Sequence, residues 1–213
     1  MSDLREKLAA FLQWNQDLYG KEWFIEQKVS ELEKFRQEIE HCTKCPLHQS
    51  RTNFVFGDGN ENADIMFIGE APGAEEDKQG LPFVGRSGQL LNKILAHFNM
   101  RREDVFIANI LKSRPPGNRD PLPEEVAACI PYLHRQIELI SPKVLIALGR
   151  VAGQNLLRTD APLRELRGKF HDFRGIPLFI TYHPAYILRN MSAMDDAISD
   201  FSTVLAKISS EKE

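Results

Sequence analysis

The chain is 213 residues long, which suits one ordinary domain or one domain with an appendage. It is 42% hydrophobic and 27% charged, as in an average soluble globular protein, so a mostly disordered, fibrous or collagen-like chain is excluded. Its longest apolar runs, such as residues 144–148, are too short to span a bilayer, and no signal pattern opens the chain. The sequence therefore predicts a soluble, cytoplasmic monomer without membrane association.

The charge is balanced rather than basic. There are 27 Lys and Arg against 30 Asp and Glu, a net charge of −3, and residues 1–40 hold 6 of the basic and 9 of the acidic residues. Nucleic-acid-binding proteins are often strongly basic. Any affinity for DNA must therefore come from a local cluster of positive charge.

Residues 1–40 predict two helices, because apolar side chains recur there at helical spacing on either side of Tyr19 and Gly20. The first set is Leu4, Leu8, Phe11 and Leu12, and the second is Val29, Leu32, Phe35 and Ile39. We interpret residues 1–40 as a helical N-terminal extension that packs on the body of the protein or on a partner, and residues 41–213 as the main domain.

From residue 64 the pattern alternates between strands and helices. Short apolar runs predict buried strands at residues 64–69, 105–110, 143–148 and 178–181. Apolar stripes at helical spacing predict helices at residues 90–98, 123–140 and 194–208, with a short helix after Gly149. This order predicts an α/β fold, a three-layer α/β/α sandwich around a central, mostly parallel four-stranded sheet.

Three of the predicted strands are followed by unusual loops, and ligands of such sheets bind beyond the carboxyl ends of the strands. The loop after Gly69 contains four carboxylates in nine residues, which disfavours a triphosphate, and it lacks the spacing of a P-loop or a dinucleotide fold. The second loop follows Asn109, and the third begins at His183.

Five segments carry a resemblance to a known family. They are Cys42-Thr-Lys-Cys45, residues 69–86 (GEAPGAEEDKQGLPFVGR), residues 111–121 (LKSRPPGNRDP), residues 142–149 (PKVLIALG) and residues 183–189 (HPAYILR). Together they resemble the family 4 uracil-DNA glycosylases, the thermostable, iron–sulfur branch of that superfamily, over residues 41 to about 190. The resemblance implies a monofunctional enzyme of base-excision repair that hydrolyses the bond between uracil and deoxyribose, leaves an abasic site and needs no diffusible cofactor.

The resemblance also implies a uracil pocket. Phe83 matches the aromatic residue that stacks on the base, and Asn109 matches the asparagine that accepts from uracil N3–H and donates to O4. Gly69 and Ala71 belong to the same pocket, and Glu76 matches a position near uracil C5 that excludes the methyl group of thymine. The alternatives are that Phe83 is an ordinary core residue and that Asn109 caps a turn.

Two residues are predicted to act on the bond. His183 matches the histidine that donates a hydrogen bond to O2 as negative charge develops there. Glu70 is our prediction for the carboxylate that orients the attacking water and stabilises positive charge on the sugar, the alternative being a solvated or capping side chain. The neighbouring Glu75 and Asp77 are predicted to be solvated charges at a helix start.

Local positive charge and an apolar segment are predicted to contact DNA. The basic residues are Lys112, Arg114, Arg119, Arg167, Lys169 and Arg189. The segment after His183 is where the family inserts a wedge into the duplex, with Ile187 or Leu188 as the inserting residue. The alternative is a helix that buries these two side chains.

The cluster ligands depart from the family pattern, which has four cysteines. Cys42, Cys45 and Cys129 match three of them, and the fourth position is Ser113. An [4Fe–4S] cluster is normally held by four thiolates. It could persist with the Ser113 oxygen or an external ligand and be more labile, it could be lost, or zinc could bind the cysteines with His41 or His48. We favour the cluster.

Two other functions compete with the enzyme. One is a binding protein of the same superfamily that holds uracil-DNA, or forms a covalent adduct with it, without turnover. The covalent branch carries a basic loop with histidine, and residues 111–121 contain no histidine. The other is an interaction module whose N-terminal helices dock on a polymerase or another repair or replication partner.

Overall fold

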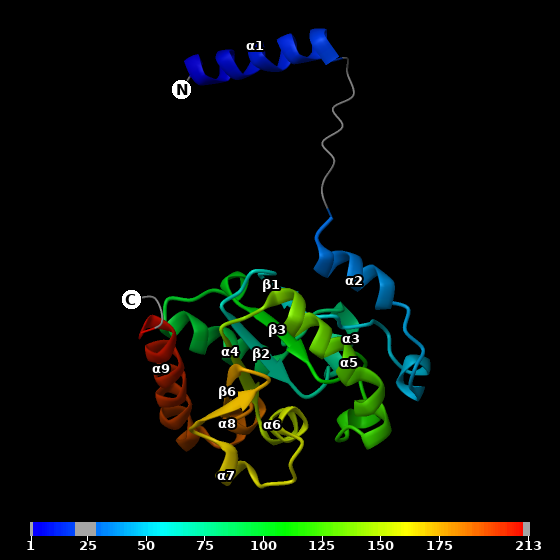
Figure 1. Ribbon diagram of the computed structural model, residues 1–213, viewed down its shortest axis with the longest axis vertical. Helices are drawn as coiled ribbons and strands as arrows, with labels where there is room; N and C mark the ends of the chain where they lie inside the picture. Colours follow the sequence, from blue (N-terminus) through cyan, green and yellow to red (C-terminus); the bar gives the residue numbers. More distant parts are fainter. Residues whose placement is uncertain (1, 20–28, 211–213) are drawn as a thin grey trace. The chain divides into compact units, whose positions relative to one another are not determined.

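The computed structural model describes residues 2–19 and 29–210, and the chain divides into two compact units, Met1–Ser30 and Glu31–Glu213 (Figure 1). The first unit contains helix α1, Ser2–Tyr19, in agreement with the first predicted helix. The turn predicted at residues 19–20 extends beyond the described residues. None of the described helices is long and apolar enough to cross a membrane.

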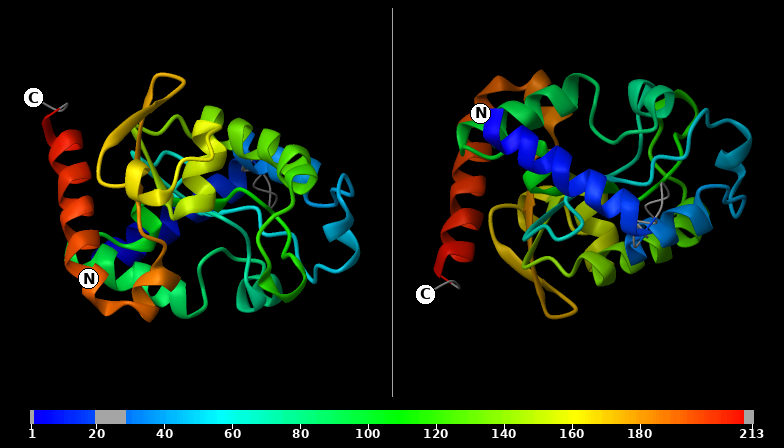
Figure 2. Two further views of the ribbon diagram at one scale, coloured as in Figure 1. Left: turned by 90° about the horizontal axis from the view of Figure 1, so that it is seen from below. Right: turned by 90° about the horizontal axis from the view of Figure 1, so that it is seen from above.

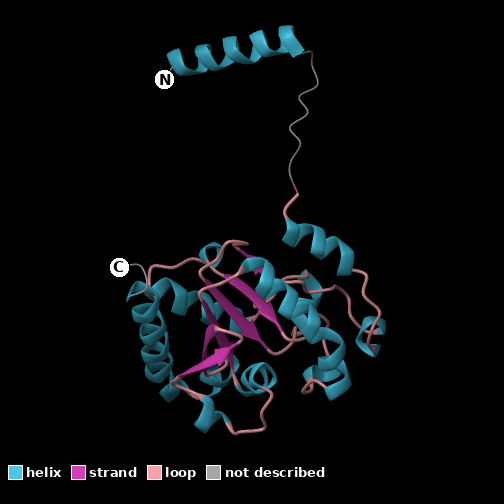
Figure 3. Cartoon of the chain, viewed as in Figure 1, coloured by secondary structure: helices cyan, strands magenta, loops and turns pink. Residues whose placement is uncertain are grey.

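The second unit is built on a six-stranded sheet with the order β1-β3-β2-β4-β6-β5. Figure 3 draws the strands of this unit in magenta among its helices. Its four central strands are parallel and match the four predicted ones: β2 (Ile65–Gly69), β3 (Phe106–Asn109), β4 (Val144–Leu148) and β6 (Ile176–Thr181). The edge strands were not predicted. They are β1 (Asp58–Gly59) and β5 (Phe170–Phe173), each antiparallel to its neighbour.

The sheet is covered on both faces, which confirms the predicted three-layer sandwich (Figure 2). Side chains of a strand alternate between its two faces. Met66 and Ile68 therefore share a core with α5 (Pro123–Ile140) and α6 (Arg150–Leu157). Ile65 and Phe67 share the other core with α4 (Arg86–His97) and α9 (Met194–Ser210). The remaining short helices are α3 (Ala74–Gln79), α7 (Leu163–Leu166) and α8 (Pro184–Arg189).

Helix α2, Glu31–Ile39, belongs to the second unit. Its Leu32 and Ile39 are buried in the core that contains α5, and the ring centroid of Phe35 lies 6.0 Å from that of Phe56 and 6.2 Å from that of Tyr132. The compact unit thus begins at Glu31, before the boundary predicted at residue 40, because α2 buries its apolar face against the main domain.

Candidate active site

The three predicted loops meet at one edge of the sheet. Gly69 at the end of β2 pairs in register with Asn109 at the end of β3, and Leu148 pairs with Thr181 just before His183. Beyond these strand ends lies a cavity of about 620 Å³. Among its lining residues are six of the seven residues predicted for base binding and catalysis: Glu70, Ala71, Glu76, Phe83, Asn109 and His183. The seventh, Gly69, lies against Phe83 and Asn109.

Asn109 presents an unpaired amide to this cavity. Its side chain is 1% exposed, and neither Oδ1 nor Nδ2 has a hydrogen-bond partner in the structure. Leaving buried polar atoms unpaired typically costs about 1–3 kcal/mol each, so such an arrangement calls for an explanation. Because the amide forms no hydrogen bond with another residue, it does not cap a turn. One donor and one acceptor, side by side, are available to a ligand that fills the cavity.

The ring of Phe83 forms one wall of the cavity. It lies against Gly69, where an added Cβ would approach Phe83 Cζ to 2.6 Å and Asn109 Oδ1 to 2.4 Å. The Phe83 and His183 ring centroids are 5.6 Å apart. Phe83 is also buried and packs in the core with α4, so it is both a core residue and a wall of the pocket.

His183 is held in one tautomer by the start of α8. The Ala185 backbone N–H donates to His183 Nδ1 at 3.0 Å, so in the neutral ring the proton is on Nε2. Burial lowers the pKa of His183 to about 4, and the Arg189 charge acts in the same direction. The imidazole is therefore neutral near pH 7 and can donate one hydrogen bond from Nε2. Gly149 makes room for it, since its φ is +93° and an added Cβ would lie 2.9 Å from His183 Cβ.

The carboxyl group of Glu70 has an unusually high pKa. This pKa is raised to about 7, chiefly by burial and also by the Asp120 carboxylate, while the Arg150 charge opposes both effects. Arg150 Nη2 lies 2.8 Å from Asp120 Oδ2, so the two charges that act on Glu70 are themselves paired. A carboxyl group that titrates near neutral pH in a cleft is suited to proton transfer or to stabilising a cation.

The comparisons with known proteins agree with the site that these residues form. Residues 56–207 match the family described as the Uracil DNA glycosylase superfamily. The chain belongs to that superfamily. Curated type-4 uracil-DNA glycosylases are similar to it over most of its length, which puts the chain in the type-4 family.

Three of these relatives show the extent of the similarity. The protein from Archaeoglobus fulgidus is 44% identical over 83% of this chain and 92% of its own length. The protein from Thermotoga maritima is 48% identical over 76% of this chain and 85% of its own. The protein from Pyrobaculum aerophilum is 46% identical over 75% of this chain and 85% of its own length.

Two acidic residues beside the pocket, Glu76 and Asp77, accept hydrogen bonds from backbone N–H groups. Glu76 lines the cavity, and its Oε1 also accepts hydrogen bonds from the N–H groups of Val84 and Gly85, both at 2.9 Å. The prediction that Asp77 is solvated was wrong. Asp77 is 5% exposed and accepts from the Thr52 N–H at 2.8 Å, because the loop before β1 folds over α3. Glu75 is exposed, as predicted.

Two of the residues predicted to contact DNA are buried in the structure. Lys112 is 0% exposed, and its Nζ donates to Asn109 O at 2.9 Å and to Gln136 Oε1 at 2.6 Å, so it cannot reach a phosphate. Ile187 is 1% exposed and packs in the core with α4 and α9, so it is not the wedge. Leu188 is half-buried against the same core.

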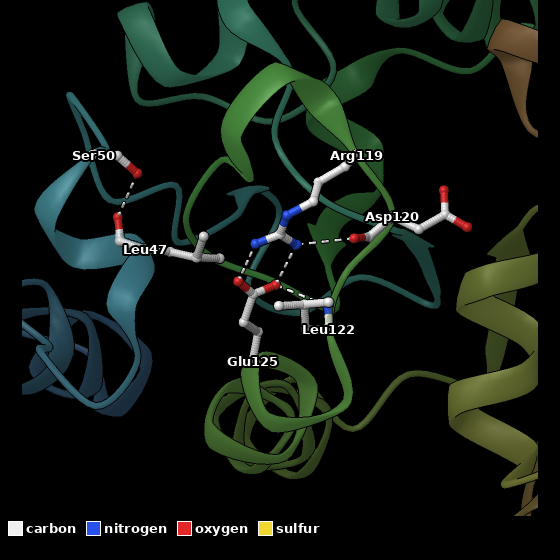
Figure 4. A network of polar contacts seen from close by, with 6 residues as sticks. All are labelled: Leu47, Ser50, Arg119, Asp120, Leu122 and Glu125. Atoms are coloured by element: carbon white, nitrogen blue, oxygen red, sulfur yellow. Dashed lines mark hydrogen bonds and ion pairs between the residues drawn. The ribbon is translucent and has the colours of Figure 1, made fainter.

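Arg119 is held by α5, although it borders the cavity (Figure 4). Its guanidinium forms two bonds, at 2.6 and 2.9 Å, with the carboxylate of Glu125, which also accepts from the Leu122 N–H. Arg114 similarly donates to Asn118 Oδ1 at 2.8 Å. These side chains shape the loop after β3.

The remaining predicted DNA contacts differ in exposure. Arg167 is half-buried between Asp196 and Asp200, whereas Lys169 and Arg189 are exposed. The sequence interpretation did not single out Tyr186, which is 40% exposed, lines the cavity and stacks on Tyr182 with ring centroids 4.9 Å apart. A tyrosine in an apolar segment resembles a core residue, so only the fold distinguishes it from Ile187.

The cysteines lie around the end of α2 and one face of α5. Cys42 and Cys45 pack against the core that contains Cys129, and the Tyr132 hydroxyl donates to Cys42 Sγ at 3.1 Å. At the fourth position, the Ser113 hydroxyl accepts from Arg51 Nη1 at 3.2 Å, so a guanidinium lies beside this hydroxyl. Over residues 2–19 and 29–210, no group of three or more His, Cys, Asp or Glu is arranged to hold a metal ion. Because the sequence contains three cysteines, it does not supply a four-thiolate set.

Proposed function

We propose that this chain is a uracil-DNA glycosylase that hydrolyses the N-glycosidic bond of deoxyuridine in DNA, releases uracil and leaves an abasic site for base-excision repair. The curated type-4 relatives support this activity. The single observation that carries it is the buried, unpaired carboxamide of Asn109 facing a cavity beside Phe83 and His183.

Recognition begins when the base leaves the DNA stack and enters the cavity. Phe83 stacks on the base, a contact worth roughly 1–3 kcal/mol. Asn109 Oδ1 accepts from uracil N3–H while Nδ2 donates to O4. Cytosine carries an acceptor at N3 and a donor at C4, so both of its groups would be mispaired with the amide in a dry pocket. Sites that pair buried polar groups can reject such analogues by on the order of 10⁴-fold.

Cleavage requires charge stabilisation at both ends of the breaking bond. As the bond from N1 of uracil to C1′ lengthens, negative charge develops on uracil O2, where the neutral His183 donates from Nε2. Positive charge develops on the sugar, where the Glu70 carboxylate stabilises it and orients a water molecule. The water oxygen bonds to C1′, its proton passes to Glu70, and uracil leaves with the electron pair of the broken bond.

The pH dependence follows from the raised pKa of Glu70. The carboxylate is the active form, so kcat/KM is expected to rise with pH through an apparent pKa of about 7 and then to level off. Glu70→Gln should remove this inflection and lower the plateau. Single-turnover excision rates from pH 5 to 9 provide the measurement.

Two variants of the neighbouring ion pair test the origin of this pKa. Asp120→Asn removes a negative charge and should move the inflection to lower pH, whereas Arg150→Gln removes a positive charge and should move it to higher pH. Shifts in the same direction, or an inflection that persists in Glu70→Gln, would contradict the assignment.

We propose that Cys42, Cys45 and Cys129, which lie in or against one core, hold a labile iron–sulfur cluster once it is assembled, although the described residues are not arranged as metal ligands in this structure. The cluster lacks a fourth thiolate, and no step of the reaction above depends on it. Anaerobically purified protein should contain iron and sulfide that air or chelator removes, and Ser113→Cys should slow that loss. Excision should survive the loss of iron. If neither the natural chain nor Ser113→Cys contains iron, the cluster is absent.

The DNA surface and the partners are part of the same proposal. The exposed Lys169 and Arg189 support phosphate binding, and Tyr186 supports contact with the bases that flank the extruded nucleotide. A partner for the N-terminal helices of residues 1–40, a monomeric state and a cytoplasmic location stay predictions.

A gel assay tests the activity. An oligonucleotide with one uracil is incubated with the protein, heated in alkali to break abasic sites, and resolved beside matched cytosine and thymine oligonucleotides. We expect cleavage at uracil alone, and less of it with Glu70→Gln. An intact oligonucleotide would overturn the proposal, and a heat-stable shifted band would instead indicate the covalent binding protein.

A further inference from the structure

The backbone at Phe83 adopts an unusual conformation. Its φ is +51°, a region that bulky L-residues rarely occupy and that persists where the surroundings impose it. Helix α4 presses on the same peptide, since a Cβ on Gly88 would lie 1.7 Å from Phe83 O. The ring that faces the cavity is therefore placed by a backbone that needs support.

One residue outside the cavity supplies that support. Arg102, in the turn Arg102–Asp104 before β3, donates from Nη1 to Phe83 O at 3.0 Å and from Nη2 to Pro82 O. Its Nε donates to Asp58 Oδ2 at 2.9 Å, so the carboxylate neutralises and aims the guanidinium. The Arg102 side chain is 19% exposed.

The opposite side of the same segment is bound from within the cavity. The Glu76 carboxylate accepts from the N–H groups of Val84 and Gly85, directly after Phe83. The carbonyl groups of residues 82 and 83 and the N–H groups of Val84 and Gly85 are thus bound by two side chains of opposite charge. Arginine suits the carbonyl side, because its planar guanidinium donates to two adjacent carbonyl groups while a third N–H remains for Asp58.

We propose that Arg102 is a positioning residue for uracil excision, which fixes the stacking ring of Phe83 through the carbonyls of residues 82 and 83 and is itself aimed by Asp58. This inference rests on the proposed function, because it assigns the ring to the extruded base. Arg102 touches neither the base nor the sugar and acts only through Phe83.

The test is a double-mutant cycle in single-turnover excision. Arg102→Gln should lower the rate at saturating protein by about 5- to 150-fold, the range of one stacking contact. Arg102→Lys keeps the charge but loses the fork, so it should retain most of this defect. Arg101→Gln is the matched control, since Arg101 is exposed and pairs with Asp104, and it should change the rate less than twofold.

The deciding comparison uses Phe83→Ala as a second background. If Arg102 acts through the ring, Arg102→Gln should change the rate of Phe83→Ala less than twofold. Asp58→Asn, a milder change, should repeat the pattern if Arg102→Gln does not fold. An equal loss in both backgrounds means general destabilisation and overturns the inference alone. A natural chain that releases no uracil overturns the proposed function, and this inference with it.

Discussion

Asn109→Leu is expected to lower kcat/KM for uracil excision by about 10³- to 10⁴-fold while the fold is retained. Leucine has the same branching and the same number of heavy atoms but offers uracil N3–H and O4 no partner. The Asn109 amide forms no hydrogen bond with another residue, so its removal should change the free energy of unfolding by no more than about 1 kcal/mol. Single-turnover kinetics and thermal unfolding measure the two effects on one sample.

The combination of lost activity and retained stability distinguishes recognition from folding. Asn155→Leu is a suitable control, because the Asn155 amide donates to Val151 O within α6 and lies outside the cavity. It should leave excision unchanged. An Asn109→Leu protein that keeps a tenth of the activity, or that unfolds, would contradict the role given to this side chain.

His183→Asn is expected to lower the rate of excision by about 10²- to 10³-fold, the usual loss when one preorganised donor to a developing negative charge is removed. Asparagine is a good helix N-cap and can accept from the Ala185 N–H as Nδ1 does now, so α8 should still form. The shorter side chain does not reach the position of Nε2. Rates at saturating protein, with circular dichroism as a check on the fold, provide the measurement.

A histidine elsewhere on the domain gives the comparison. His134 lies on α5 beside Arg174, outside the cavity, and His134→Asn should leave the rate unchanged. Because burial keeps His183 neutral down to a pH of about 4, its protonation should not appear in the rate profile near neutral pH. An acid loss of activity near pH 6 that vanishes in His183→Asn would contradict the neutral donor.

The central sheet could be predicted from sequence because its strands are buried on both sides. The residues of β2 and β4 are all buried, and such strands read as continuous apolar runs. The edge strands lack this signal. β1 has two residues, Asp58 and Gly59, and β5 has two polar residues between two phenylalanines, of which only Phe173 is buried. Their pairing depends on neighbours that are distant in the sequence.

The pocket could be predicted for a similar reason. Its residues follow strand ends, and the parallel register of β2, β3 and β6 brings those ends together, so recognisable motifs in three loops suffice. Burial of individual polar residues could not be predicted. Lys112 follows β3 by three residues and resembles any surface lysine until Gln136 of α5 is found beside it. Arg102 stands among Arg101, Glu103 and Asp104, and only the fold places it on the carbonyl of Phe83.

The release of free uracil is the most direct test of the whole account. Double-stranded and single-stranded oligonucleotides with one uracil are incubated with the full chain, and the small-molecule fraction is separated by chromatography. We expect free uracil in equal amount to new abasic sites, and no thymine or cytosine from matched oligonucleotides. DNA that is bound with its uracil still attached, by a protein whose fold is intact, would contradict the claim that this pocket both reads and expels the base.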